Sequence, residues 1–207
     1  MSDKSTNAEG NRRRFFRIDD AVRFAYRPLA PDELAAGVAR LNEGLGGPYA
    51  LMASLAAVSQ RMSVSLRRIE QKSNDVAQYL KALDRKIDTV ARTLLLQSSD
   101  LAARPPEPVN LSAGGLAVPV QTGLPPGTPV EIRLLLLPSL AGILAYGAVV
   151  ECTTPAEQGD FPAGSRVMRI DFTHIRDEDR DLLIRHMLRR QGESLRRQRA
   201  AAEGDVE

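Results

Sequence analysis

Hydrophobic residues alternate with polar ones in some parts of the chain and recur every three or four residues in others. The first spacing predicts strands and the second predicts helices. Apolar and polar residues roughly alternate between residues 16 and 29, which is typical of a β-strand. Pro31 and the two acids that follow it then favour the first turn of a helix. We expect this short helix to cover residues 32–43 and to end at 44–48, where glycines and a proline break the pattern.

Residues 49–103 contain neither proline nor glycine and follow a heptad repeat. With Met52 as the first a position, apolar residues fill eleven of the fourteen a and d positions. The pattern predicts a single helix, about 80 Å long at a rise of 1.5 Å per residue. Because this length exceeds the width of a small domain, we expect most of the helix to pack against helices of other chains in a coiled coil.

The residue types at the a and d positions predict how many helices assemble. Leucine at a, as in Leu66 and Leu80, together with β-branched residues at d, as in Ile69 and Val76, favours three or four strands over two. We therefore expect a homo-oligomer, with a tetramer favoured. An alternative folds the long helix back as a hairpin against residues 32–43. The predicted interface contains Leu55, Met62, Leu66, Ile69, Val76, Leu80, Leu83, Ile87, Val90 and Leu94.

After Pro106 the pattern changes to short apolar stretches separated by turn residues, which predicts a small antiparallel β-barrel. A helix follows from about Asp177, where acidic residues suit a helix start, and it leads into a basic extension at 192–207. The expected fold class is α+β, a small barrel with a C-terminal helix, interrupted by a helical insertion. The barrel strands are expected at 16–29, 109–111, 116–121, 130–137, 143–152 and 166–172.

Composition excludes several classes of protein. With 28 basic and 26 acidic residues, the overall charge does not indicate a nucleic-acid-binding protein. The single cysteine, Cys152, fits a reducing cytosol, and neither a secretory signal nor a bilayer-spanning apolar run is visible, so we expect a cytoplasmic protein. Residues 1–10 are polar and are expected to be disordered. His174 and His186 are interpreted as structural or solvated, and we expect no catalytic residue, metal or cofactor.

Two motifs carry the candidate chemistry. Arg13 and Arg17 form Arg-x-x-x-Arg, and Asn110, Ser112 and Gly115 form Asn-x-Ser-x-x-Gly. In this order, and followed by a predicted barrel, the two motifs resemble the signature of PilZ domains. The resemblance covers about 11–29 and 106–191 and makes 30–105 an insertion. It implies a receptor for the second messenger cyclic di-GMP, and not an enzyme.

Arginine suits this ligand because its guanidinium can hydrogen-bond two guanine acceptors at once, and can also stack on a base. Arg13 and Arg17 are the predicted principal contacts, with Arg14 auxiliary. Asn110 and Ser112 can hydrogen-bond a guanine edge or a phosphate, and Gly115 would allow close backbone approach or a positive φ. In similar proteins, an arginine at the position of Arg12 is associated with binding two stacked ligand molecules instead of one.

Simpler interpretations of the same residues are possible. An arginine-rich leader is often a solvated tail, and Asn, Ser and Gly are common turn residues for local reasons. The main alternative function is therefore an oligomeric PilZ-like scaffold that binds no nucleotide. A nucleic-acid-binding protein that uses its arginines is a weaker alternative, because no aromatic residues are interleaved with the arginine-rich end of the chain. The downstream partner is not indicated.

Overall fold

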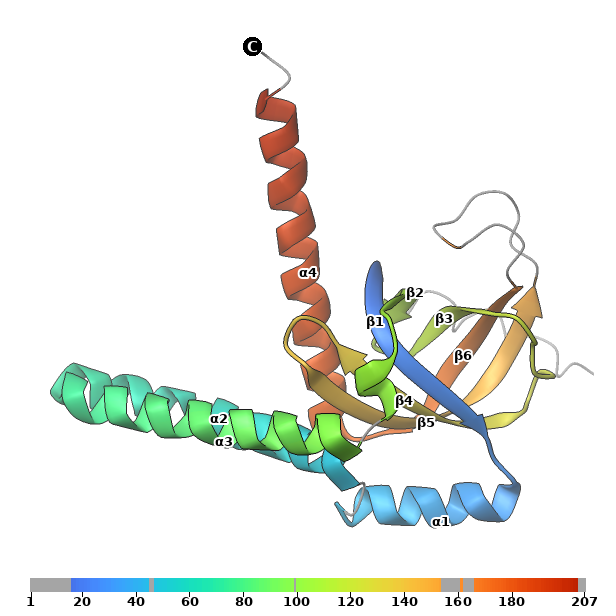
Figure 1. The fold of residues 1–207 in the computed structure, drawn as a ribbon, viewed down its shortest axis with the longest axis horizontal. Helices are drawn as coiled ribbons and strands as arrows, with labels where there is room; N and C mark the ends of the chain where they lie inside the picture. Colours follow the sequence, from blue (N-terminus) through green and yellow to red (C-terminus); the bar gives the residue numbers. More distant parts are fainter. Residues whose placement is uncertain (1–15, 45–46, 99, 154–160, 162–165, 205–207) are drawn as a thin grey trace, which may run out of the picture.

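A computed structural model describes residues 16–44, 47–98, 100–153, 161 and 166–204 of the chain. Figure 1 shows a β-barrel with one short helix beneath it, two long helices side by side, and a C-terminal helix that rises from the barrel. The elements in chain order are β1 (Arg17–Pro28), α1 (Pro31–Asn42), α2 (Gly47–Lys72), α3 (Asn74–Ser98), the 3-10 turn η1 (Asp100–Ala103), β2 (Glu107–Ser112), β3 (Gly115–Val120), β4 (Pro129–Leu136), β5 (Ala141–Thr153), β6 (Arg166–Ile175) and α4 (Asp177–Gly204).

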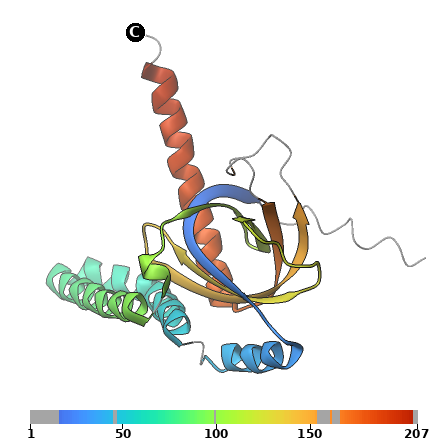
Figure 2. The same ribbon diagram turned by 45° about the vertical axis from the view of Figure 1, so that its right-hand side comes forward.

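The six strands form a closed antiparallel barrel in the order β1-β2-β3-β6-β5-β4 (Figure 2). The first half of β1 pairs with β2 and its second half with β4, so β1 closes the barrel. Alternate residues of each strand point inward, and their apolar side chains form one buried core. This arrangement confirms the predicted α+β fold class, a small barrel with a C-terminal helix.

A second apolar core lies outside the barrel and anchors the helices. Tyr49, Met52 and Leu95, near the ends of α2 and α3, pack there with Leu144 and Tyr146 of β5. Only this end of the helix pair is attached to the barrel, and the opposite end projects away from it (Figure 1).

The prediction of one helix over 49–103 is wrong. The chain reverses at Ser73, and α2 and α3 lie antiparallel as a hairpin, with Ser59 bonded to Asp84 at 2.9 Å. Ser73 acts as the N-cap of α3, because its carbonyl accepts the first bond of that helix from Ala77 at 3.2 Å. Serine is among the best residues for this position. The alternative, a hairpin with residues 32–43, is also wrong, since α1 packs beneath the barrel.

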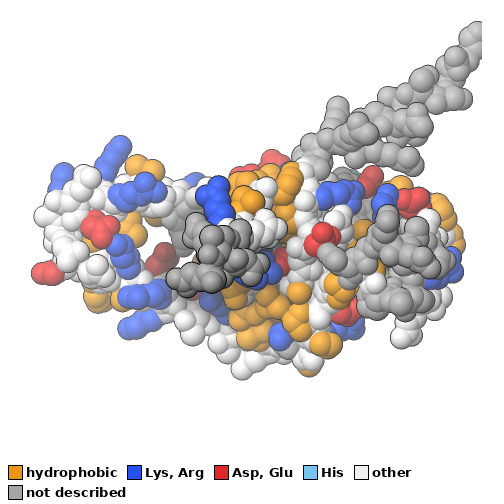
Figure 3. All heavy atoms as spheres, turned by 90° about the horizontal axis from the view of Figure 1, so that it is seen from above, with side chains coloured by type: hydrophobic (Ala, Val, Ile, Leu, Met, Phe, Trp, Pro, Cys, Tyr) orange, Lys and Arg blue, Asp and Glu red, His pale blue; other side chains and the backbone are white. Residues whose placement is uncertain are grey.

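The α2–α3 hairpin buries small residues and leaves large apolar ones uncovered. Ala77 and Ala91 are almost fully buried, and such small side chains let the two helices approach closely. The outer face of α3 exposes a line of apolar side chains at helical spacing, which we call the α3 stripe. Figure 3 shows apolar patches on the hairpin among its lysine and arginine side chains. The α3 stripe consists of Val76, Leu80, Leu83, Ile87, Val90 and Leu94.

The ten residues of the predicted oligomer interface divide into two groups in a single chain. Leu55, Leu66 and Ile69 of α2 are half-buried. Met62 and the whole α3 stripe are exposed, and Val90 reaches 69%. The helices of one chain therefore do not cover each other's apolar faces.

Candidate functional site

Strand pairing brings the two sequence motifs together at one place on the barrel. In the register of β1 and β2, Arg17 lies opposite Ser112 and Asp19 lies opposite Asn110. Arg17 Nη1 donates a hydrogen bond to Asn110 Oδ1 at 3.0 Å. Asn110 Nδ2 in turn donates to Asp19 Oδ1 at 2.8 Å. The last arginine of the first motif and the first residue of the second are therefore in direct contact, although 93 residues separate them.

The tight turn between β2 and β3 is held by Ser112. Its hydroxyl donates to the carbonyl of Gly115 at 3.0 Å and accepts from the amide of Gly114 at 3.3 Å. The side chain is almost fully buried. Ser112 thus fixes the shape of the turn through bonds within the turn itself.

Gly115 is required by the packing of the barrel. A β-carbon at this position would collide with the backbone carbonyl of Ile170 on β6. The φ of Gly115 is not in the left-handed region, so the expected positive φ is not found. The expected close backbone approach is found, and it is to the neighbouring strand β6.

Helix α4 supports the same end of the barrel at two points. Arg180 Nη1 donates to the carbonyl of Ala113, in the β2–β3 turn, at 2.6 Å. On β1, the buried carboxylate of Asp20 accepts from His186 Nε2 at 2.6 Å and from Arg190 Nε at 2.7 Å. Burial alone would raise the pKa of Asp20, but the bonds from His186 and Arg190 outweigh it and hold the pKa below its ordinary value.

A cleft lies between the start of β1 and the outer half of α4, and Asp19, which accepts a hydrogen bond from Asn110, is one of its lining residues. Its volume is about 490 Å³, and its lining includes Phe16, Asp19, Gln191 and Arg197. Volumes of this order accommodate small organic ligands. The cleft combines an aromatic side chain, an arginine and an amide, which can contact a base and a phosphate.

Arg12, Arg13 and Arg14 lie outside the residues that the structure describes, so their predicted contacts stay predictions. The described part of the chain contains no group of three or more His, Cys, Asp or Glu side chains placed to hold a metal ion. Within the same residues, no helix is both long and apolar enough to cross a bilayer.

Sequence reasoning missed the acidic and basic residues that connect β1 to α4. Asp20 gave one usable signal, because it occupies an inward position between Ile18 and Val22 in an alternating strand. A carboxylate at such a position needs buried partners, and His186 and Arg190 supply them. Nothing in the sequence pairs these residues, which lie more than 160 positions apart.

The closed six-stranded barrel, with a C-terminal helix bonded to it, defines a small antiparallel β-barrel domain. Residues 91–189 match the family model described as the PilZ domain, so this region of the chain is similar to PilZ domains. The matched region begins within α3 and does not include β1 or Arg17.

A solved structure shares this fold over most of both chains. It is described as a pathogenic protein from Xanthomonas campestris with a tetrameric PilZ domain that self-assembles through an unusual helical bundle. The likeness covers 88% of this chain and 90% of the other, with a TM-score of 0.51 and 16% sequence identity. At this identity the likeness concerns the fold alone. The comparison with curated proteins found no match.

Proposed function

We propose that this protein is an oligomeric receptor for cyclic di-GMP. PilZ domains are binding domains rather than enzymes, and cyclic di-GMP is the ligand generally associated with the family. The observation that carries the proposal is the hydrogen bond between Arg17 and Asn110, which joins the two motifs. Asp19, bonded to Asn110, also lines a cleft of about 490 Å³. Arg12, Arg13 and Arg14 immediately precede Arg17 in the sequence, and their contribution to the same site is part of the proposal.

The proposed mechanism is closure of the arginine leader over a bound ligand. Arg13 and Arg17 would contact guanine or phosphate, while Asn110 and the β2–β3 turn form the fixed half of the site. In the free protein Arg17 bonds to Asn110, so ligand binding would exchange this contact for one to the ligand. The surface formed by residues 11–17 would then change, and a downstream partner could recognise that change.

Self-association is the second part of the proposal. The exposed α3 stripe supports it, because contiguous apolar surface of this kind is costly in water. The tetrameric state of the Xanthomonas campestris protein favours a tetramer here. Each chain contributes two helices, so a four-helix bundle needs only two chains, and a tetramer would join eight helices or two such bundles.

Isothermal titration of the purified protein with cyclic di-GMP, with GTP as the control, tests the receptor proposal. We expect selective binding. The number of cyclic di-GMP molecules bound per chain will show whether the ligand binds as a stacked pair, as the presence of Arg12 predicts. Arg13→Ala and Arg17→Ala should each weaken binding by about 10- to 150-fold, the value of a charge-assisted contact. Arg68→Ala removes an exposed arginine of α2 and should leave the affinity unchanged.

A specific observation favours the alternative function, an oligomeric scaffold that binds no nucleotide. The hydroxyl of Ser112 is engaged within the turn, and Gly115 is needed for barrel packing, so two motif residues have structural roles without a ligand. If wild-type protein does not bind cyclic di-GMP but still self-associates, the scaffold becomes the better account.

A further inference from the structure

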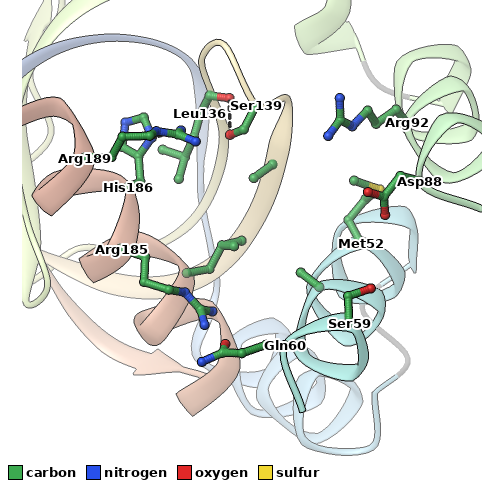
Figure 4. Close-up of a pocket in the computed structure, with 13 residues that line it drawn as sticks. Met52, Ser59, Gln60, Asp88, Arg92, Leu136, Ser139, Arg185, His186 and Arg189 are labelled. Atoms are coloured by element: carbon green, nitrogen blue, oxygen red, sulfur yellow. Dashed lines mark hydrogen bonds between the residues drawn. The ribbon is translucent and has the colours of Figure 1, made fainter. Parts of the chain in front are cut away.

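A second cavity lies at the junction of the helical hairpin and the barrel, away from the motif residues. It has a volume of about 390 Å³, is open to solvent on one side, and is lined by residues of α2, α3, α4 and the β4–β5 connection (Figure 4). None of Arg17, Asn110, Ser112 and Gly115 lines it. A ligand in this cavity would therefore not occupy the proposed cyclic di-GMP site.

Three arginines from two helices converge on this cavity. Arg92 extends from α3 toward Ser139, and Arg185 extends from α4 toward Gln60, as Figure 4 shows. Arg189, one turn after Arg185, also lines the space. Asp88 is the one carboxylate in the lining, so the cavity carries a net positive charge of at least two.

Arg92 carries a buried donor group that no acceptor in the described part of the chain reaches. Among the described residues, its Nε is buried without a hydrogen-bond partner, whereas Arg189 has a contact with His186 at 3.3 Å. A buried donor left without a partner is unfavourable, because water no longer solvates it. The Nε itself is not reached by solvent, but the guanidinium end of Arg92 points into the cavity, where an anion would accept hydrogen bonds from it (Figure 4).

The rest of the lining identifies the kind of anion. Met52, Leu136 and Leu182 provide apolar surface, while Ser59, Gln60 and Ser139 provide neutral hydrogen-bonding groups. Arginine clusters match phosphate oxygens in geometry and charge. Apolar surface beside them suits a carbon skeleton, and the volume is that of a small-molecule site.

We propose that this cavity binds a small organic phosphate of about mononucleotide size. The phosphate would lie between Arg92 and Arg185, and the organic part would lie against Met52 and Leu182. Because Arg92 belongs to the hairpin and Arg185 to α4, the ligand would connect the two and restrict movement of the hairpin relative to the barrel. This inference does not depend on the cyclic di-GMP proposal.

Titration of the full-length protein with adenosine monophosphate and with inorganic pyrophosphate at about 50 mM salt tests this site, since charge interactions are then weakly screened. We expect one bound molecule per chain. Arg92→Gln and Arg185→Gln should each weaken binding about tenfold or more. Arg68→Gln makes the same charge change outside the cavity and should have no effect, and neither should Arg17→Ala in the other site. Two variants on different helices are used so that a folding defect in one does not decide the result.

Three outcomes would overturn the proposal. The first is that neither probe binds the wild-type protein. The second is that the two cavity variants bind as well as wild type, or that Arg68→Gln is weakened as much as they are. The third is that Arg17→Ala alone abolishes binding, because the probes would then occupy the cyclic di-GMP site.

Discussion

Asp20 shows how one residue joins the N-terminal strand to the C-terminal helix. Its carboxylate is fully buried and is paired with His186 and Arg190, which both belong to α4. We expect Asp20→Asn to lower the free energy of unfolding at pH 7 by about 3–5 kcal/mol. The substitution removes the buried negative charge that pairs with His186 and Arg190. Urea unfolding followed by circular dichroism would measure the loss. Asp19→Asn, at the exposed neighbouring position, keeps the Oδ1 that accepts from Asn110 and should cost no more than about 0.5 kcal/mol.

The same residue predicts how stability depends on pH. The pKa of Asp20 is lowered in the folded protein from the ordinary value of 3.8. Its contribution to stability is therefore fully present above pH 3.8 and is lost as the pH falls through the lower folded pKa. The difference in unfolding free energy between wild type and Asp20→Asn should narrow below pH 3.8. A difference that stays constant down to pH 2.5 (about the lowest pH at which urea curves are practical) would contradict this role.

At the scale of elements, the hairpin depends on small residues in its seam. Ala77 has no exposed surface and lies where α3 meets α2. We expect Ala77→Leu to destabilise the protein by about 1–3 kcal/mol, because the larger side chain overpacks the contact between the helices. Gln78→Leu places the same side chain at the exposed neighbouring position and should have little effect. Equal effects of the two substitutions in thermal unfolding would argue for a continuous helix instead of a hairpin.

The α3 stripe, in contrast, is predicted to act between chains. Leu80 and Leu83 are each 37% exposed, so part of each side chain is available to a partner chain, and charges there would be buried by association. We expect the double substitution Leu80→Glu with Leu83→Glu to reduce the mass measured by light scattering to that of one chain. Gln78→Glu with Thr89→Glu adds the same charge at exposed positions outside the stripe and should preserve the assembly. If the stripe variant keeps its oligomeric mass, another surface mediates association.

For the whole molecule, assembly should stabilise the fold by mass action. Association that favours the folded state makes the melting temperature rise with protein concentration. We expect this rise for wild type, measured by scanning calorimetry over a hundredfold concentration range, and a constant melting temperature for the double stripe variant. A wild-type melting temperature that does not depend on concentration would contradict self-association through the stripe.

Local patterns determined the elements that have strong periodicity. The alternating residues of β1, the β-rich segment after residue 106 and the helix from Asp177 were all predictable, because strand and helix periods follow from local backbone geometry. The heptad repeat correctly predicted helix over most of 49–98. It could not show that the chain reverses at Ser73, because one helix and a hairpin of two helices give nearly the same apolar spacing.

By itself, the sequence determined which residue types could contact a nucleotide and that the helices within 49–98 would carry an apolar face. Only the tertiary structure decided that Arg17 contacts Asn110, that Asp20 is paired through α4, and that Arg92 and Arg185 face one cavity. The residues in each of these groups lie about ninety or more positions apart in the sequence. Strand register and helix packing set such distances, and neither is encoded in the local pattern around any one of the residues.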